Sequence, residues 1–191
     1  MPGTVSTTNK LPLITLAFWI MKICATTLGE TAGDLLSMTL NVGYALSSLI
    51  LIGAFVVALT AQLLARAHHP WLYWTVILTT STAGTTMSDY MDRTLGLGYA
   101  RGSAILIFLL ISVLTVWRIS EKSLSVTDVH SRRAESFYWA AILVSNTLGT
   151  ALGDYLADDS GLGFAGGALL IAGLIAMIFW ITRPRKAPTS A

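Results

Sequence analysis

The sequence predicts an all-α integral membrane protein with six transmembrane helices, arranged as three two-helix repeats of parallel orientation. Three observations support this fold class. Hydrophobic residues make up 54% of the 191-residue chain and charged residues only 12%, whereas roughly a quarter of the residues in soluble proteins are charged. Six segments are mostly apolar and reach the length of about 20 residues that a helix needs to cross a bilayer. The third observation is an internal threefold repeat.

The six predicted spans follow one another along a single membrane domain. They cover approximately Leu13–Ser37, Val42–Ala65, Pro70–Asp89, Tyr99–Ile119, Ser136–Ala157 and Leu162–Thr182. The repeats therefore extend over about 13–65, 70–119 and 136–182. A cytoplasmic linker is expected over about 120–135, and a basic C-terminal tail over 183–191.

Lysine and arginine gather on one side of the predicted spans. That side holds Lys10, Arg66, Arg118, Lys122, Arg132, Arg133, Arg183, Arg185 and Lys186, and the other holds Arg93 and Arg101. Because cytoplasmic loops are enriched in lysine and arginine, we expect both termini in the cytoplasm. Trp19, Trp74 and Trp139 lie near the starts of the odd-numbered spans, and we expect them to anchor the protein at the membrane interface.

The internal repeat aligns Trp19–Leu49 with Trp74–Ala104 and Trp139–Leu169 without a gap. Six columns are identical in all three copies: Trp19/Trp74/Trp139, Thr27/Thr82/Thr147, Gly29/Gly84/Gly149, Asp34/Asp89/Asp154, Gly43/Gly98/Gly163 and Ala45/Ala100/Ala165. Because each copy contains two spans, successive copies insert in the same direction and are related by rotation about the membrane normal. Three copies can close into a bundle around one axis, and a pairwise stack or a dimer of bundles also satisfies the sequence.

The pattern W-x7-T-x-G-x4-D followed by G-[YF]-A resembles a family of bacterial membrane proteins built from tandem repeats of unknown function. Each repeat of that family has two transmembrane regions and a characteristic tryptophan. The resemblance covers nearly the whole chain and implies a multi-pass protein of the bacterial inner membrane. Members of the family commonly have four copies, whereas this chain shows three, so either one unit is missing or assembly into a homo-oligomer supplies more.

The repeated aspartates are the first candidate functional residues. Asp34, Asp89 and Asp154 follow their tryptophans by 15 residues, about 22 Å along a helix. That distance places them in the outer part of the membrane, where a carboxylate is kept for a partner or a water-filled path. Around one axis they would form a ring that attracts cations. The alternative is that each ends its helix and stabilises the fold.

Three further columns have less specific interpretations. Thr27, Thr82 and Thr147 belong to a polar stripe that can line a conduit or hydrogen-bond between packed helices. Small residues let helix backbones approach each other closely, and six glycines are expected to do so. These are Gly29, Gly84 and Gly149 on the odd-numbered spans and Gly43, Gly98 and Gly163 on the even-numbered ones.

The first repeat alone carries Lys22 and Glu30 within its span. An ionisable residue inside the membrane is a functional candidate by default. Lys22 lies three residues after Trp19 and can extend its ammonium group to the interface, so Glu30 is the stronger candidate of the two.

The composition and these residues favour transport, or a channel, for a cation or small polar solute through an acid-lined, threonine-rich path. The alternative is a non-transporting scaffold, assembly partner or sensor. No motif indicates an enzyme, a cofactor or a metal site with histidine or cysteine spacing. A net charge of +2 gives no reason to expect nucleic acid, so the expected partners are lipid, the transported solute and further copies of the chain.

Overall fold

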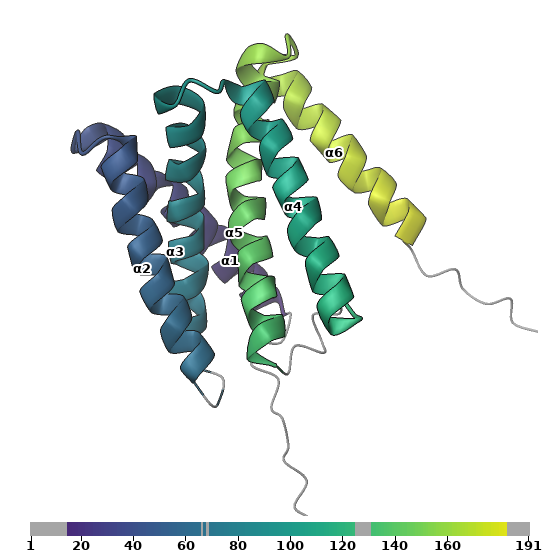
Figure 1. Cartoon of the computed structure of the whole chain (residues 1–191). Coiled ribbons are helices and arrows are strands. Elements are labelled where there is room, and N and C mark those ends of the chain that lie inside the picture. Colours follow the sequence, from purple (N-terminus) through teal and green to yellow (C-terminus); the bar gives the residue numbers. More distant parts are fainter. Residues whose placement is uncertain (1–14, 66, 68, 125–130, 183–191) are drawn as a thin grey trace, which may run out of the picture. The chain divides into compact units, whose positions relative to one another are not determined.

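Six long helices make up the computed structural model, which describes residues 15–65, 67, 69–124 and 131–182. They are α1 (Leu16–Asp34), α2 (Tyr44–Leu64), α3 (Pro70–Asp89), α4 (Tyr99–Glu121), α5 (Arg132–Asp154) and α6 (Gly163–Thr182) (Figure 1). Within the described residues there is no strand, so the predicted all-α, six-helix fold is confirmed. Lys10, Arg66 and the predicted basic tail lie outside the described residues.

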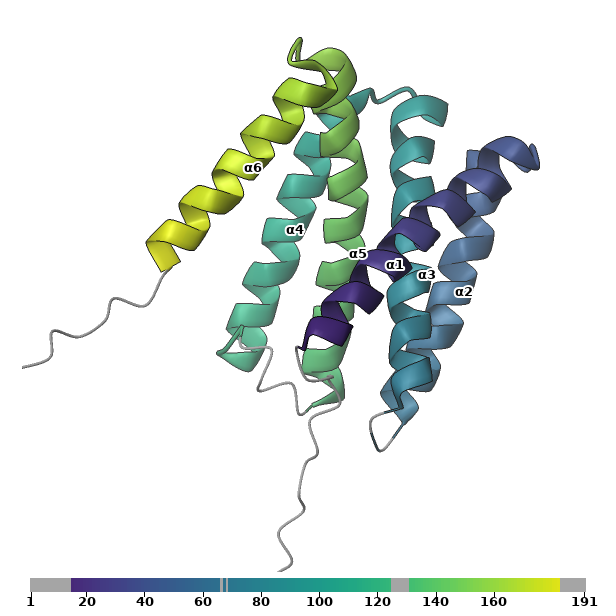
Figure 2. The same cartoon turned by 180° about the vertical axis from the view of Figure 1, so that it is seen from behind.

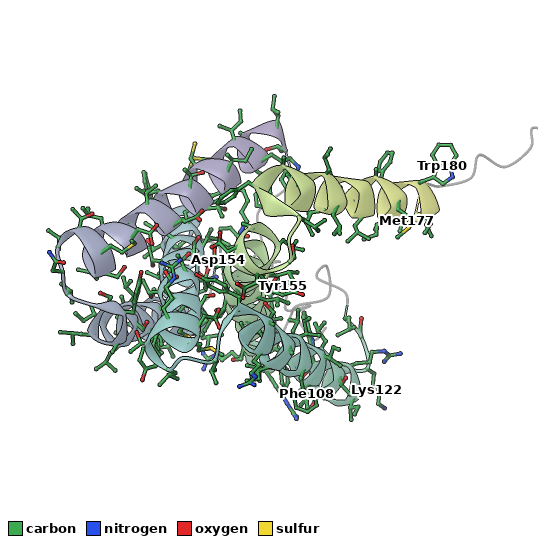
Figure 3. All side chains as sticks on the ribbon, turned by 90° about the horizontal axis from the view of Figure 1, so that it is seen from above. Phe108, Lys122, Asp154, Tyr155, Met177 and Trp180 are labelled. Atoms are coloured by element: carbon green, nitrogen blue, oxygen red, sulfur yellow. The ribbon has the colours of Figure 1, made fainter. Side chains whose placement is uncertain are left out.

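Three of the helices are long and apolar enough to cross a membrane, which identifies the chain as a membrane protein. They are α2, α4 and α6, with mean hydropathies of 2.1, 2.1 and 2.3. Large apolar side chains on them are exposed, among them Phe108 on α4 and Met177 and Trp180 on α6 (Figure 3). The odd-numbered helices do not reach the same apolarity, because polar residues are spread along them.

The chain divides into two units, Met1–Leu152 and Gly153–Ala191. In the first unit, α3 has more buried residues than any other helix and packs against both α1 and α2. Figure 2 shows α1 crossing α3. An apolar cluster of Phe55, Ala58, Tyr73, Val76, Ile77 and Trp139 joins α2, α3 and α5. The second unit is a helical hairpin in which Gly167 lies against Leu156.

The three repeats share an unusual turn after their odd-numbered helices. Each α-helix ends at the repeated aspartate and continues as a five-residue π-helical segment: Leu35–Thr39, Tyr90–Thr94 and Tyr155–Asp159. One equivalent backbone hydrogen bond closes each segment, at 2.9 Å in all three copies. Single π-helical turns are rare and occur frequently at functional sites. Their recurrence shows that the sequence repeat is also a structural repeat.

The glycines of the even-numbered helices require a correction. Gly43, Gly98 and Gly163 are expected from the sequence to pack helices. Apart from their chain neighbours and the nearby backbone of the same helix, however, no described atom lies within 4 Å of the position that a Cβ would take. Their φ angles are +81°, +72° and +66°, a region that residues with a side chain rarely adopt. These glycines therefore let the chain turn into the next helix.

The predicted linker between the last two repeats is partly helical. Helix α4 continues to Glu121, and α5 begins at Arg132. Ser131 caps α5, because its hydroxyl accepts a hydrogen bond of 2.9 Å from the backbone N–H of Ala134. Helix α4 therefore ends later, and α5 begins earlier, than the apolar segments of the sequence predict.

Candidate functional site

Neighbouring repeats contact each other through one recurring pair of positions. A Cβ on Gly29 would lie 2.6 Å from Ser81 Oγ, and a Cβ on Gly84 would lie 2.9 Å from Asn146 Cβ. Ser81 and Asn146 are equivalent positions of the second and third repeats. The glycine of one repeat therefore packs against the residue at this equivalent position in the next repeat. The predicted packing role of these two glycines agrees with the structure.

The third equivalent glycine has no such neighbour. Apart from Gly149 itself, its chain neighbours and the backbone of its own helix, no described atom lies within 4 Å of a Cβ placed on Gly149. If the relation continued around an axis, Gly149 would meet Thr26, the first-repeat equivalent of Ser81. Instead, Gly149 and Thr26 line one cavity between α1, α3 and α5. Two of the three possible glycine contacts between repeats are therefore formed, and a cavity occupies the place of the third.

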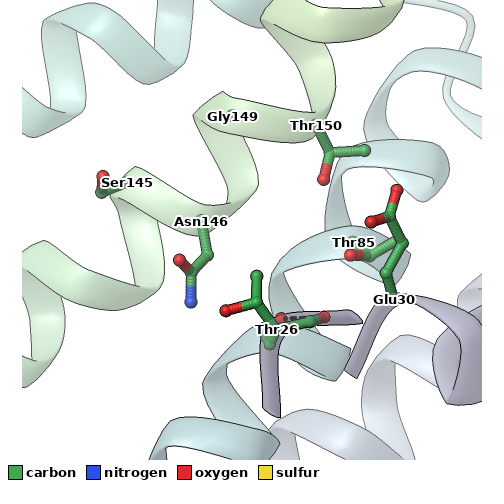
Figure 4. A pocket seen from close by; sticks show the side chains of 8 residues that line it. Thr26, Glu30, Thr85, Ser145, Asn146, Gly149 and Thr150 are labelled. Carbon is green, nitrogen blue, oxygen red and sulfur yellow. Dashed lines mark hydrogen bonds between the residues drawn. The ribbon is translucent and has the colours of Figure 1, made fainter. Parts of the chain in front are cut away.

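The cavity has a volume of about 230 Å³ and is lined mainly by polar side chains (Figure 4). Its lining residues are Thr26, Glu30, Ser81, Thr85, Ser145, Asn146, Gly149 and Thr150. Six of these form two threefold sets of equivalent positions, Thr26/Ser81/Asn146 and Glu30/Thr85/Thr150. The odd-numbered helices thus present the same two positions, one helical turn apart, to a shared polar space.

Glu30 is the only ionisable residue in this lining. Figure 4 shows its side chain on the side of the cavity where Thr85 and Thr150 lie, and the Asn146 amide near Thr26. Asn146 Nδ2 is buried and has no hydrogen-bond partner within the part of the chain that the structure describes. A buried amide normally has such a partner, so this group is available to a bound molecule or water.

Two hydroxyl groups at the cavity are already committed as donors. Thr26 Oγ1 donates to the carbonyl of Lys22 at 2.6 Å, and Ser81 Oγ donates to the carbonyl of Thr26 at 3.2 Å. A hydroxyl group has one proton to donate and two lone pairs. At these two positions the oxygen can therefore act toward the cavity only as an acceptor.

Comparison with protein families matches the description Repeat of Unknown Function (DUF347) to residues 17–68, 72–123 and 137–186. The chain belongs to this family. The three matches coincide with the three repeats found in the sequence, and the predicted family is confirmed. Neither the curated proteins nor the solved structures give a match to the chain.

The aspartates of the three DUF347 repeats do not line the cavity. Asp89 is buried, and its Oδ1 lies 3.1 Å from Arg93 Nε. Asp34 is half-buried at the end of α1, and Asp154 is half-buried in the second unit. The position of Asp89 at the helix end, beside a cation, agrees with the alternative in which it stabilises the fold.

Arg93 extends the contacts of this ion pair in the π-helical turn of the second DUF347 repeat. Its Nη1 donates to Tyr44 Oη at 3.1 Å, and its guanidinium carbon lies 5.8 and 5.9 Å from the ring centroids of Tyr44 and Tyr99. Burial alone would lower the pKa of Arg93, but the Asp89 carboxylate and the two tyrosines outweigh it and raise the pKa. The arginine therefore stays charged.

The repeated threonines are committed to their own helices or face outward. Thr82 Oγ1 donates to the Leu78 carbonyl at 3.1 Å, and Thr147 Oγ1 donates to the Leu143 carbonyl at 2.9 Å. Both are buried beside the close contacts of Gly29 and Gly84. Thr27 is exposed. None of the three lines the cavity, and neither does Lys22. The carbonyl of Lys22 accepts a hydrogen bond from the lining residue Thr26.

The repeated tryptophans have different surroundings. Trp139 is fully buried, Trp74 is half-buried and Trp19 is 54% exposed. Phe18 contacts Trp74 with ring centroids 5.6 Å apart, and the equivalent Tyr73 contacts Trp139 at 5.5 Å. The aromatic side chain of one repeat thus packs on the tryptophan of the next. Trp139 is held by protein rather than by the membrane interface, whereas an anchoring role for Trp19 stays a prediction.

The cavity positions could have been found in the sequence by comparing the polarity of equivalent residues, rather than their identity, across the three repeats. Thr26, Ser81 and Asn146 differ in type, yet all are polar in spans that are mostly apolar. A search for conserved polarity across the three aligned copies would have found this set and the set that contains Glu30.

The sequence analysis also missed a polar pair away from the cavity. Gln62 and Glu135 are both buried, and Gln62 Nε2 donates to Glu135 Oε1 at 3.1 Å.

Proposed function

We propose that the protein transports a cation or a small polar solute across the membrane, and that the cavity between α1, α3 and α5 is the binding site on its path. The observation that carries this proposal is a polar cavity, with one carboxylate, between helices of a membrane protein. Ionisable and polar side chains within membrane segments usually face a bundle interior or a water-filled space, where they mark solute pathways.

In this proposal Glu30 supplies the charge, and neutral hydroxyl and amide groups complete the site. The repeated aspartates have no direct part in binding in this proposal, because none of them lines the cavity and Asp89 is paired with Arg93. Asp89 instead holds the outer turn in place. The acidic residue of the path is therefore the one that occurs in the first repeat alone.

The proposal places all six helices across the bilayer, with both termini in the cytoplasm. Helices α1, α3 and α5 are less apolar than α2, α4 and α6 because their polar positions meet one another at the cavity. Their cost of insertion is reduced when neighbouring helices cover them. The lysine and arginine bias and the family resemblance support an inner-membrane location in a bacterium.

The test is a flux measurement in proteoliposomes that contain the full chain. Uptake of Na⁺, K⁺, methylammonium and glycerol is compared with that of empty liposomes. For a solute that the wild type carries, Glu30→Gln should reduce the rate at least tenfold if the solute is a cation. Asp159→Asn removes an exposed carboxylate elsewhere in the chain and should leave the rate unchanged. A wild-type rate equal to that of empty liposomes for every solute would reject transport of these classes.

A non-transporting scaffold is the second candidate function. The close contacts of Gly29 with Ser81 and of Gly84 with Asn146 favour it, because such interlocked helices form rigid bundles. The two candidates differ in the expected role of Glu30. A scaffold predicts that Glu30→Gln changes neither solute flux nor any property of the folded protein that depends on cations.

A further inference from the structure

We propose that the cavity between α1, α3 and α5 binds one monovalent cation, either an alkali metal ion or a small protonated amine, with the Glu30 carboxylate as its counter-charge. This inference rests on the proposed function in using the same cavity, and it narrows the solute to one charge class. It concerns binding, which can be measured without transport.

The first argument is charge balance. The lining contains one carboxylate and no lysine, arginine or histidine. Within a membrane an uncompensated charge is costly, so the bound species is expected to cancel the charge of Glu30. A single positive charge does so, whereas calcium sites use several carboxylates among six to eight oxygen ligands. The lining therefore matches a monovalent rather than a divalent cation.

The second argument is the supply of oxygen atoms. Thr26 and Ser81 use their hydroxyl protons on backbone carbonyls, at 2.6 and 3.2 Å, so each oxygen presents only lone pairs to the cavity. An anion or a hydrogen-bond acceptor would be repelled by these atoms and by Glu30. A metal ion, or the N–H groups of an ammonium, would be bound by both.

Asn146 adds an adaptable group to this set. Its amide lies at the cavity with the Nδ2 atom buried and without a partner among the described residues. The oxygen and nitrogen ends of an amide are nearly alike in shape, and rotation of the group exchanges them. The amide lies across the cavity from Glu30 (Figure 4), and its oxygen is a further possible ligand of a cation.

The third argument is size. A volume of about 230 Å³ holds a small ion and several waters, since one water occupies about 30 Å³ in the liquid. Sodium, potassium and methylammonium ions fit such a space with part of their hydration. N-methyl-D-glucamine has a six-carbon polyhydroxyl chain and is much bulkier than these ions, so it serves as the reference salt.

The equivalence of positions around the cavity gives the test a matched design. Glu30, Thr85 and Thr150 occupy the same position of their repeats and line the same space. A carboxylate moved from Glu30 to Thr150 should therefore serve the same cation. The double variant Glu30→Thr/Thr150→Glu keeps the composition of the cavity and changes only the helix that carries the charge.

The experiment is a thermal-unfolding titration of the purified full chain in detergent, with NaCl, KCl or methylammonium chloride replacing N-methyl-D-glucamine chloride at constant ionic strength. The wild type should show a saturable rise in Tm with at least one of the three salts. Glu30→Gln should weaken the apparent affinity at least tenfold, and Asn146→Ala, which keeps the Cβ atom that packs on Gly84, at least threefold. Asp159→Asn should bind as the wild type does, and the double variant should recover binding to within about threefold.

The outcomes separate the two possible ions and the two proposals. Saturation with sodium or potassium alone identifies an alkali metal site, and saturation with methylammonium alone identifies an amine site. No saturable response of the wild type to any of the salts, or equal affinity in Glu30→Gln, would overturn the inference. Should Glu30→Gln not fold, loss of binding in the folded Asn146→Ala protein supports the site, and wild-type affinity overturns it. Binding without flux rejects only transport, whereas flux of glycerol without cation binding rejects only the cation site.

Discussion

Arg93 Nε lies 3.1 Å from Asp89 Oδ1, and this ion pair ties the end of α3 to its π-helical turn. The same guanidinium donates to Tyr44 Oη at the start of α2. This arginine is therefore one of the links between the second repeat and the first. At the equivalent positions the first repeat has Met38 and the third has Asp158, so the identical aspartates have different local surroundings.

The ion pair predicts an asymmetric effect of its two members on stability. The Asp89 side chain is only 5% exposed, whereas that of Arg93 is 39% exposed. Arg93→Gln leaves a buried carboxylate without this cation and should lower the free energy of unfolding by about 2 kcal/mol, less than for a fully buried pair because water reaches the arginine. Asp89→Asn leaves a cation that can turn toward water and should cost about 1 kcal/mol.

Unfolding by a denaturing detergent, followed by tryptophan fluorescence, measures both effects. Asp34→Asn is the matched control, since no arginine stands four residues after Asp34. This control should change the free energy of unfolding by less than about 0.5 kcal/mol. Equal effects at Asp34 and Asp89 would contradict the stabilising role of the arginine.

Close contact between repeats predicts which glycines tolerate a methyl group. A Cβ on Gly84 would lie 2.9 Å from Asn146 Cβ and 3.1 Å from the backbone nitrogen of Thr147. Because the backbone cannot yield as a flexible side chain can, Gly84→Ala should lower the free energy of unfolding by about 1–3 kcal/mol. Thermal unfolding in detergent, with Tm as the readout, checks this value.

The control for Gly84 lies on α2. No described atom is found within 4 Å of a Cβ on Gly53, and the position is exposed. Gly53→Ala should be neutral or raise stability by up to about 1 kcal/mol, because alanine favours the helix. A loss at Gly53 as large as that at Gly84 would show that the methyl group acts through the helix itself rather than through the neighbouring repeat.

The repeat made the fold predictable, and the contacts between repeats limited what could be said about the site. A fixed spacing of identical residues predicted six helices in three equivalent pairs, and each aspartate does end an α-helix. Rotation about the helix axis was not predictable, because the threonine column and the polar column that lines the cavity are adjacent in the sequence. The sequence leaves open whether the threonine column lines a path or hydrogen-bonds between helices, and the structure places Thr26 and its equivalents at the cavity.

The aspartates illustrate a second limit. Identical residues were expected to share one environment, but the partner of Asp89 comes from a position that varies among the repeats. A residue that is identical in all three repeats indicates a shared backbone conformation, which here is the start of a π-helical turn. Such identity does not indicate which side chains contact the residue. Those contacts decide whether a carboxylate is paired with a cation or can bind a solute.

A buried polar pair near the start of α5 predicts a further effect on stability. Gln62 Nε2 donates to Glu135 Oε1 at 3.1 Å, and both side chains are buried. Gln62→Leu removes a donor from a buried carboxylate and should lower the free energy of unfolding by about 2 kcal/mol, as for other hydrogen bonds to charged groups. Detergent-induced unfolding provides the measurement.

The matched control for Gln62 is another polar residue of α2. Thr60 is exposed, and its hydroxyl donates to the Val56 carbonyl of its own helix at 2.7 Å. Thr60→Val should change the free energy of unfolding by no more than about 0.5 kcal/mol. If Gln62→Leu were as well tolerated as Thr60→Val, the link between α2 and α5 would contribute nothing to stability.

The repeated tryptophans give the most direct comparison of equivalent positions. Trp139 is 0% exposed and packs against Tyr73, whereas Trp19 is 54% exposed. Trp139→Ala should lower the free energy of unfolding by about 3 kcal/mol, the lower end for such a substitution, because lipid also solvates apolar groups well. Trp19→Ala should cost less than about 1 kcal/mol.

The indole nitrogen of Trp139 separates packing from hydrogen bonding. Trp139 Nε1 is buried and has no hydrogen-bond partner among the described residues, so Trp139→Phe loses volume but no hydrogen bond. We expect a cost of about 1–2 kcal/mol, smaller than that of Trp139→Ala because the ring contact with Tyr73 is retained. Unfolding of the three variants in one detergent ranks them. A phenylalanine as costly as alanine would mean that the indole N–H, rather than the ring, holds α5 in place.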